Sequence, residues 1–221
     1  MTISANKLAE SAKHFGADDV AIYQPADLDG HFMATQIIPN LPSRGYGFWK
    51  WKPYIILGHL KVACKEGDTI IYSDAGVEIV SNLNYLVHAM KDDIMLFTNG
   101  FEHSHWCKGD IMKAINGDYT IGYKQCQASL ILFKATQKAI DFVQEWLAYC
   151  CIPGLIDDSP SKFPNAPEFA ENRHDQACLT ALAIKYNHPL RWFPSSTALH
   201  LREIEPYPVM LHHNRKRNNE W

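Results

Sequence analysis

The chain has 221 residues, of which 47% are hydrophobic and 20% are charged, and its formal net charge is −3. This balance is ordinary for a globular protein and gives no reason to expect a nucleic-acid-binding or membrane surface. The six cysteines form no Cys-x-x-Cys pair, and no apolar run approaches the length of a membrane span. We therefore expect free thiols, no targeting segment and a cytoplasmic location for a single domain that spans residues 1–221.

The N-terminal segment predicts a helix followed by a strand. Apolar residues recur at helical spacing across residues 4–15, and Gly16 provides a C-terminal stop. Residues 19–23 then form a short apolar run that predicts the first strand, which ends at Pro25. A helix followed by a strand is typical of an alternating α/β domain.

Residues 44–54 interleave glycines, aromatic rings and cations, and two interpretations of this block stay open. In one, the aromatic rings cover the core while the cations are solvated. In the other, a flexible glycine loop brings Arg44 and Lys52 to a phosphate, and an aromatic ring covers a base or a sugar. Pro53 suits the first turn of a helix that continues through residues 54–64.

Residues 69–72 are β-branched or aromatic, and they are too few for a helix, so they predict a buried, central strand. Ser73, Asp74, Ala75 and Gly76 end this run and leave one carboxylate at the carboxyl end of the strand. Ligands of open α/β sheets bind at that end, and a lone Asp there suits Mg²⁺ or Mn²⁺ carrying a diphosphate. The alternative is a strand that ends in an ordinary Asx turn.

Helices and strands continue to alternate through the rest of the chain. The predicted elements are a helix at 81–90, a strand at 94–97, a turn at 99–100, an irregular stretch at 121–127, a strand at 128–133, a helix capped by Thr136, a helix at 177–186 and a strand at 190–193. Residues 152–170 contain too many prolines for a regular element. A loop of this length in a compact domain is often a wall or lid over a site.

Two further positions carry polar groups that invite a functional interpretation. His103 and His105 are two residues apart, as metal ligands on a strand would be, but no third ligand is evident, so solvated or hydrogen-bonded histidines are favoured. Asp175 lies at the start of the predicted helix at 177–186, where the helix dipole favours a carboxylate. Its simplest role is therefore N-terminal capping.

Five motifs follow one another along the chain. They are Arg-Gly-x-Gly-aromatic-Trp-x-Trp-Lys-Pro-Tyr at 44–54, Tyr-x-Asp-Ala-Gly at 72–76, Trp-x-Lys-x-Asp at 106–110, Arg-His-Asp-Gln at 173–176 and His-His-x-Arg at 212–215. Together they resemble GT-A-type nucleotide-sugar glycosyltransferases of microbial and large-virus origin. The pattern is most similar to the N-terminal glycosyltransferase domain of the enzymes that large algal viruses (chloroviruses) use on their capsid glycans.

The resemblance implies a single GT-A domain with a mixed, mostly parallel sheet flanked by helices. It divides the chain into a nucleotide-binding half at roughly 1–100 and an acceptor half at roughly 101–221. The implied activity is transfer of a glucose- or rhamnose-like hexose from a UDP-sugar to a glycan hydroxyl, with inversion at the sugar carbon. The implied acceptor is a glycan on a viral capsid protein, in the host cytoplasm.

The resemblance also implies a metal ion and a set of site residues. GT-A enzymes usually hold Mn²⁺ or Mg²⁺ through an Asp-x-Asp signature, whose first Asp matches Asp74, while Gly76 stands in place of the second. A C-terminal histidine, His212 or His213, would complete the shell, and such an Asp/His shell suits Mn²⁺ better than Mg²⁺. The other implied roles are Asp175 as general base, Arg44, Lys52 and Lys108 as cationic contacts, Tyr23 near the nucleobase, and Ser73 and Ala75 beside Asp74 in the donor site.

Two other functions compete with this one. A nucleotide-sugar-binding module without catalysis would explain the missing second carboxylate of the Asp-x-Asp signature. A metal-dependent phosphohydrolase could instead use Asp74, Asp175 and histidines, and it would cleave simple phosphoesters.

Overall fold

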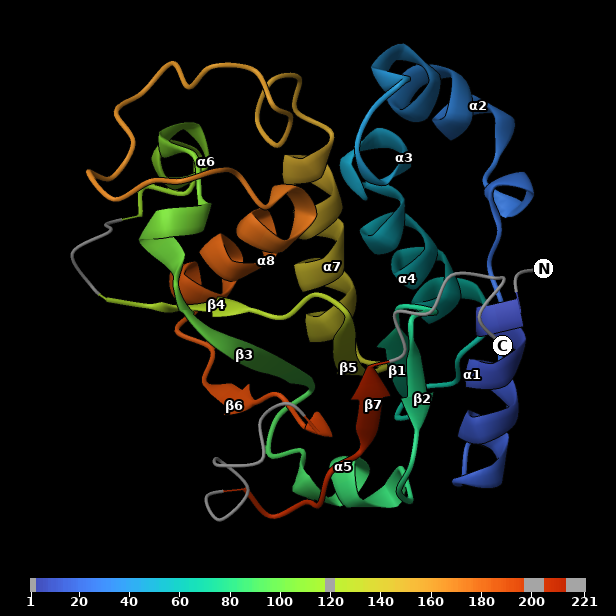
Figure 1. Ribbon diagram of the computed structural model, residues 1–221. Helices are drawn as coiled ribbons and strands as arrows, with labels where there is room; N and C mark the ends of the chain where they lie inside the picture. Colours follow the sequence, from blue (N-terminus) through green and yellow to red (C-terminus); the bar gives the residue numbers. More distant parts are fainter. Residues whose placement is uncertain (1–2, 118–121, 197–204, 214–221) are drawn as a thin grey trace.

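A sheet of five strands lies between two groups of helices in the computed structural model, which describes residues 3–117, 122–196 and 205–213 (Figure 1). The sheet order is β1 (Thr69–Ser73), β5 (Leu130–Lys134), β3 (Ile94–Glu102) and β4 (Lys124–Cys126), and β6 (Leu190–Trp192) also pairs with β3. A separate pair of short strands joins β2 (Val77–Ile79) to β7 (Leu211–His213).

The sheet separates two hydrophobic cores because its strands are apolar on both faces. In β5, Ile131 contributes to one core, whereas Leu130 and Leu132 contribute to the other. The same alternation occurs in β3, where Leu96 and Phe97 point to opposite cores. Side chains of successive strand residues point to opposite faces, so continuous apolar runs are what a sheet covered on both sides requires.

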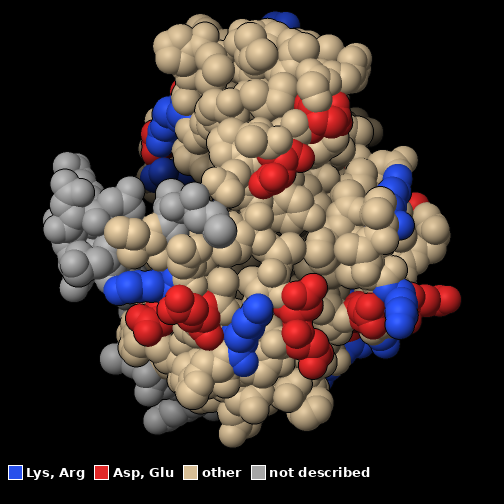
Figure 2. Space-filling view, turned by 90° about the vertical axis from the view of Figure 1, so that its right-hand side faces the viewer, with Lys and Arg blue, Asp and Glu red and all other residues tan. Residues whose placement is uncertain are grey.

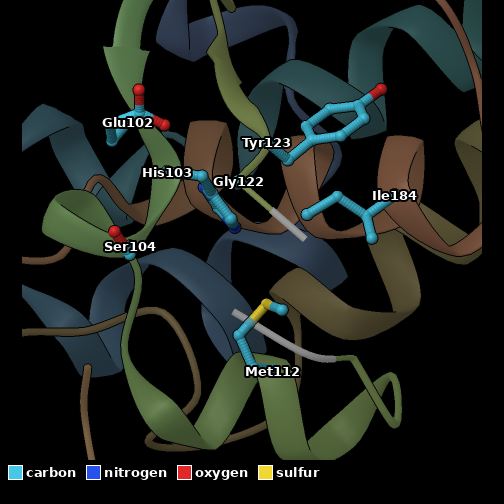
Figure 3. A pocket seen from close by; sticks show the side chains of 7 residues that line it. All are labelled: Glu102, His103, Ser104, Met112, Gly122, Tyr123 and Ile184. Atoms are coloured by element: carbon cyan, nitrogen blue, oxygen red, sulfur yellow. The ribbon is translucent and has the colours of Figure 1, made fainter. Parts of the chain in front are cut away.

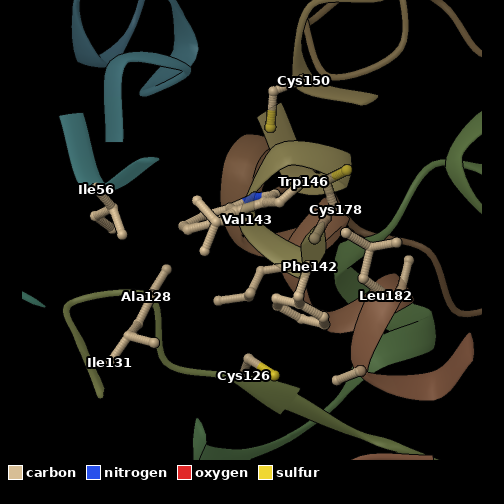
Figure 4. Packing of buried hydrophobic residues seen from close by; sticks show 14 of the residues in the cluster. Ile56, Cys126, Ala128, Ile131, Phe142, Val143, Trp146, Cys150, Cys178 and Leu182 are labelled. Atoms are coloured by element: carbon tan, nitrogen blue, oxygen red, sulfur yellow. The ribbon is translucent and has the colours of Figure 1, made fainter. Parts of the chain in front are cut away.

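Three long helices cover one face of the sheet: α4 (Trp51–Val62), α7 (Gln137–Cys150) and α8 (His174–Lys185). Figure 4 shows the core between them, where Trp146 of α7 packs beside Cys178 of α8. The other face is covered by α5 (Asn84–Ala89) and the β2–β7 pair, with α1 (Ile3–His14) packed against β2. The remaining helical segments are Pro25–Asp27, α2 (Gly30–Phe32), Met33–Ile37, Ile38–Asn40, α3 (Gly45–Phe48), His103–Trp106 and α6 (Gly109–Ala114).

The expected α/β class, with a mixed sheet flanked by helices, is confirmed. The helix predicted after Thr136 forms as α7, and the Thr136 hydroxyl accepts a hydrogen bond from the Ala139 amide at 3.3 Å. The strand directions differ from the expected parallel majority. Among the described pairings, β1–β5, β3–β5 and β3–β4 are antiparallel, and β3–β6 is parallel.

Four local predictions are wrong. Residues 19–23 form no strand, and the Tyr23 hydroxyl instead bonds to His59 of α4. The stretch at 121–127, expected to be irregular, contains β4. The turn expected at 99–100 is part of β3, where Gly100 has a φ of +84° and the register with β4 shifts. The strand β1 lies at the edge of the described sheet, not at its centre.

The distribution of charged side chains on the surface agrees with the composition. On the face shown in Figure 2, basic and acidic side chains are interspersed, so this face presents no field of a single sign. Within the described ranges, no helix is both long and apolar enough to cross a membrane. The division of the chain into a nucleotide-binding half and an acceptor half stays a prediction.

Candidate functional site

Asp74 lies immediately after β1, where the chain leaves the sheet. Its amide donates a hydrogen bond to the Ser129 carbonyl at 2.9 Å, which fixes the turn against the start of β5. The Tyr72 hydroxyl donates to Asp74 Oδ1 at 2.6 Å, and the Asp74 side chain remains 36% exposed. Tyr72 and Asp74 are two residues apart, so their side chains leave the strand on the same side. The carboxylate is therefore held from one side and open to solvent on the other.

Lys52, in the first turn of α4, places its ammonium group beside this carboxylate. Lys52 Nζ lies 3.1 Å from Asp74 Oδ1 and 3.3 Å from Asp74 Oδ2. It also donates to the Ala128 carbonyl at 3.3 Å, and its side chain is only 5% exposed. Burial by itself lowers the pKa of Lys52, but the charges of Asp175 and Asp74 outweigh burial and raise this pKa above its ordinary value. The lysine is therefore a permanent cation at the end of β1.

Asp175 approaches the same ammonium from the other side. It lies in the first turn of α8, and its Oδ2 atom is 3.7 Å from Lys52 Nζ. That oxygen is buried and accepts no hydrogen bond, while the Asp175 backbone carbonyl accepts one from Trp146 Nε1 at 3.0 Å. Burial raises the pKa of Asp175 to about 7, against the opposing charge of Lys52 and with a further increase from Asp74.

The three groups form a carboxylate–ammonium–carboxylate triad, Asp74–Lys52–Asp175, assembled from three elements. Asp74 is the outer carboxylate, which solvent can reach, and Asp175 is the inner carboxylate, whose side chain is 4% exposed. A carboxyl group with a pKa near neutrality can accept a proton from a substrate at physiological pH. The triad therefore combines an exposed anion with an inner group suited to proton transfer.

Two more of the residues expected in the donor site lie near the triad. Ser73, the last residue of β1, donates from its hydroxyl to the Asp74 carbonyl at 3.3 Å. Ala75 occupies the turn between β1 and β2, next to Asp74. Both positions agree with the expected small-residue turn after the strand.

Lys108, in contrast, is part of a different structure. Its ammonium donates to the Gly154 carbonyl at 2.8 Å and to Ser159 Oγ at 3.3 Å, and it lies 3.5 Å from Asp157 Oδ1. The loop at 152–170 thus wraps around Lys108. At Gly109, an added Cβ atom would lie 2.2 Å from the Pro164 carbonyl oxygen, so the loop passes directly over this position. The Trp-x-Lys-x-Asp motif therefore anchors the loop.

Arg44 and Tyr23 also have partners outside the triad. Arg44 Nη1 lies 3.2 Å from Glu171 Oε2, and both side chains are exposed. Glu171 in turn pairs with Arg173, whose guanidinium lies 4.5 Å from the centre of the Trp106 ring. This row of side chains runs along the segment that leads into α8. The exposed Tyr23 ring contacts α4 through His59.

His212 lies on β7, where its backbone is in register with Glu78 of β2. The C-terminal segment therefore returns to the residues that follow Asp74. However, the described residues include no group of three His, Cys, Asp or Glu side chains placed to hold a metal ion. Both oxygens of Asp74 already contact Lys52, and one also accepts from Tyr72. In the described part of the chain, the residues present do not fit a divalent-cation site.

A small pocket surrounds His103 (Figure 3). It is lined by Glu102, His103, Ser104, Met112, Gly122, Tyr123 and Ile184. His103 is buried and neither ring nitrogen has a hydrogen-bond partner, so the expectation of a solvated or hydrogen-bonded histidine is wrong. Burial lowers the pKa of His103 to about 3, so the ring is neutral. Ile184 is about 13 Å along α8 from Asp175 at the usual helical rise, so this pocket is separate from the triad.

Sequence reasoning assigned no role to several residues that build the site. Tyr72 was part of a recognised motif, and its position two residues before Asp74 is the signal that predicts a contact between the two side chains. Gln176 connects α8 to the Ala128 backbone, which also contacts Lys52: Gln176 Oε1 accepts a hydrogen bond from the Ala128 amide at 3.2 Å, and the Ala128 carbonyl accepts one from Lys52 Nζ. No pattern in the sequence indicates this second contact.

No protein-family model matches the sequence, and no curated protein matches it. Among solved structures, mouse xyloside xylosyltransferase 1 in its apo form is similar to this chain, with 11% sequence identity and a TM-score of 0.42. The similarity covers 83% of this chain and 70% of that chain.

Proposed function

We propose that this chain is a glycosyltransferase that moves a hexose from a nucleotide-sugar, specifically a UDP-sugar, to the hydroxyl group of a glycan. The observation that carries the proposal is the triad. An exposed carboxylate, Asp74, lies at the end of β1, and a buried carboxyl with a pKa of about 7, Asp175, lies behind the same ammonium group. The ordered motifs of the sequence support the same activity, since three of them supply the triad residues Lys52, Asp74 and Asp175.

In the proposed reaction, Asp175 acts as the general base. The acceptor hydroxyl gives its proton to Asp175 Oδ2, its oxygen forms a bond to the sugar carbon, and the bond from that carbon to the diphosphate breaks. Attack from the side opposite the diphosphate inverts the configuration at the sugar carbon. Because the Asp175 side chain is 4% exposed, the groups that cover it must move when the acceptor binds. Lys52 keeps the two carboxylates apart and holds Asp74 toward the donor.

The manganese ion implied by the sequence resemblance stays a prediction, and no step of the proposed reaction is assigned to it. The resemblance implies His212 and Asp74 as ligands of such an ion, whereas the described residues do not fit a divalent-cation site. The viral capsid acceptor and the glucose- or rhamnose-like donor sugar likewise stay predictions. Assays with and without Mn²⁺, and with a chelator, test the first of these directly.

The proposal is tested by measuring release of UDP from a panel of UDP-hexoses, with and without a mixture of glycan acceptors. We expect turnover that depends on the acceptor, together with a product whose anomeric configuration, measured by NMR, is inverted. Asp74→Asn should reduce donor binding in a thermal-shift assay, because ligand binding to the native state raises its stability. Turnover of simple phosphoesters without any sugar would favour the phosphohydrolase instead.

One observation favours a second candidate function, a binding module without catalysis. Gly76 offers no second carboxylate, and Lys52 already contacts both Asp74 oxygens. Such a module would bind UDP-sugars and show no acceptor-dependent turnover at any pH. Binding with no turnover would therefore replace the transferase with this module.

A further inference from the structure

The residue before Asp175 has an unusual backbone conformation. His174, the first residue of α8, has a φ of +52°. Two residues that contact its ring, Phe48 and Trp49, both have a φ of +58°. A positive φ is uncommon for residues other than glycine, and it persists only where the surrounding structure enforces it. Three such residues in mutual contact therefore mark a strained cluster next to the inner carboxylate of the triad.

The imidazole ring of His174 is held by two aromatic rings and one carbonyl oxygen, while its Nε2 atom lies 3.6 Å from Asp158 Oδ1 and has no hydrogen-bond partner. Its centroid lies 5.1 Å from that of Phe48 and 5.4 Å from that of Trp49. Its Nδ1 atom lies 2.7 Å from the Ile156 carbonyl oxygen, so Nδ1 is the protonated nitrogen and donates this bond. The residue is 1% exposed, and burial lowers its pKa, which keeps the ring neutral.

His174 thereby joins three segments that are distant in the sequence. Phe48 and Trp49 belong to the aromatic block at 44–54, and Ile156 belongs to the loop at 152–170. The Ile156 carbonyl also accepts a hydrogen bond from Asn172 Nδ2 at 3.0 Å, which ties the loop to the segment just before α8. The ring is the point where these segments meet the first turn of α8.

We propose that His174 is a positioning residue for Asp175. The His174 ring fixes the left-handed backbone conformation at the first residue of α8. It thereby holds the Asp175 carboxyl beside the Lys52 ammonium and keeps this carboxyl covered. The role in transfer rests on the proposed function, whereas the positioning itself does not. Loosening of the ring should let the first turn of α8 shift and Asp175 reach solvent. A shift of about 1 Å at a catalytic group can reduce turnover on the order of 100-fold.

The chain offers a matched control for this test. Asn187 also has a positive φ, at +52°, and follows the C-terminal end of the same helix. Glycine accepts a left-handed backbone, so His174→Gly and Asn187→Gly each remove a side chain without forcing a new backbone conformation. For His174→Gly we expect kcat to fall about 10- to 100-fold with the KM for the donor near the parent value. Asn187→Gly should keep the parent kcat.

A second measurement does not depend on activity. Carbon-13 NMR of the side-chain carboxyl groups should show Asp175 titrating near pH 7 in the parent and in Asn187→Gly. In His174→Gly the midpoint should move down toward the ordinary value for an aspartate, because the carboxyl gains access to water. If the parent shows no transfer, the proposed function fails, and this titration still tests the positioning role.

A parent-like titration and a parent-like kcat in His174→Gly would overturn the proposal. If the glycine variant does not fold, His174→Asn serves instead, because asparagine tolerates a positive φ but leaves the space between Phe48 and Trp49 unfilled. The kcat and the Asp175 titration of His174→Asn then test the positioning role. Parent-like values in a folded His174→Asn protein would mean that His174 contributes to packing alone.

Discussion

Two of the buried lysines in the described part of the chain, Lys52 and Lys108, are paired with aspartates, but the two environments have opposite effects on the pKa values of those aspartates. Lys108 is 2% exposed and is satisfied by a carbonyl, a hydroxyl and Asp157. Burial would raise the pKa of Asp157, but hydrogen bonds from Ser159 and the charge of Lys108 outweigh it and hold this pKa below its ordinary value. Lys52 is shared by two carboxylates, and the pKa of the inner one, Asp175, rises to about 7.

The difference shows that the depth of burial and the hydrogen bonds to the carboxylate, rather than the presence of a lysine alone, decide whether a paired aspartate stays ionised. The Asp157 carboxylate accepts bonds from the amide and hydroxyl of Ser159. Asp175 Oδ2 is buried and accepts none. A fully satisfied pair is suited to anchoring a loop, whereas an unsatisfied carboxyl can change its protonation at neutral pH.

The largest effect is expected for Asp175→Asn, compared with Asp157→Asn as the control. Loss of a general base typically reduces turnover by about 10²- to 10⁴-fold, and we expect this reduction in acceptor-dependent transfer. In the parent, the rate should rise with pH through about 7, as Asp175 loses its proton, and this limb should be absent from Asp175→Asn. Asp157→Asn should keep both the parent rate and the parent pH profile. Near-parent transfer by Asp175→Asn would remove Asp175 from the reaction.

The same pair of variants should differ in the pH dependence of stability. The folded-state pKa of Asp175 is raised, so its contribution to stability is fully present below the unfolded value of about 3.8 and is lost as pH rises through about 7. The pKa of Asp157 is lowered, so its contribution is present above its unfolded value and is lost as pH falls through the folded value. Urea unfolding between pH 3 and pH 8 should therefore show a smaller loss toward neutral pH for Asp175→Asn and a smaller loss toward acid for Asp157→Asn.

The second prediction concerns Lys52→Met, with Lys61→Met on the exposed side of the same helix as its control. Removing one partner of a buried ion pair typically costs about 3–5 kcal/mol, and we expect a loss of this size above pH 7. Below pH 6 the loss should be smaller, because Asp175 is then protonated and only Asp74 lacks its cation. Lys61→Met should change the free energy of unfolding by less than about 0.5 kcal/mol. An equal loss at both pH values would show that Asp175 does not change its protonation between them.

Lys108→Met should have a smaller effect, because the partners that it leaves are closer to water. Leaving buried acceptors unsatisfied costs about 1–3 kcal/mol, and we expect this loss in urea unfolding. Limited proteolysis should cut the loop at 152–170 faster in this variant, since the loop loses its anchor at Gly154 and Ser159. Lys162→Met, an exposed change in the same loop, should behave as the parent does. A parent-like cleavage rate in Lys108→Met would mean that the loop is held by other contacts.

Much of the fold was predictable because apolar period and length are local signals. The runs at 94–97 in β3 and 130–133 in β5 are apolar and lie where the sheet is covered on both faces, and Thr136 marks the start of α7. The wrong predictions of secondary structure occur where pairing with a distant segment decides whether a strand forms. Residues 124–126 have no strand signal of their own, yet they pair with β3, and the Cys126 amide donates to the Thr180 hydroxyl. Residues 19–23 have a strand signal but no strand pairs with them.

The candidate site also combines features that local sequence patterns predict with features that only packing produces. The position of Asp74 at a strand end and of Asp175 at a helix start followed from local patterns. The convergence of both on Lys52 did not, because these contacts join α4, β1 and α8, and only packing brings their ends together. Lys108 carried a signal similar to that of Lys52 in the sequence, a lysine close to a tryptophan within one of the five motifs. The difference between the two lies in the segments that fold around them.

The smallest effect is expected for Arg44, the third cation that the sequence placed at the donor. Its pair with Glu171 is exposed on both sides, and such pairs contribute about 0–1 kcal/mol, so Arg44→Ala should unfold at nearly the parent urea concentration. We expect the affinity for UDP, measured by calorimetry, to fall by about tenfold, which corresponds to one charge-assisted contact of about 1.4 kcal/mol.

Lys138 provides the control for this last prediction, because it forms an equally exposed ion pair with Asp92. Lys138→Ala should match Arg44→Ala in stability and should leave the affinity for UDP unchanged. The exposed cations Arg44 and Lys138 would then differ only in what they bind. Lys52 and Lys108 differ instead in what surrounds them. If Arg44→Ala binds UDP as tightly as the parent does, the pair of Arg44 with Glu171 is a surface contact alone. The diphosphate must then be held by other groups near Asp74.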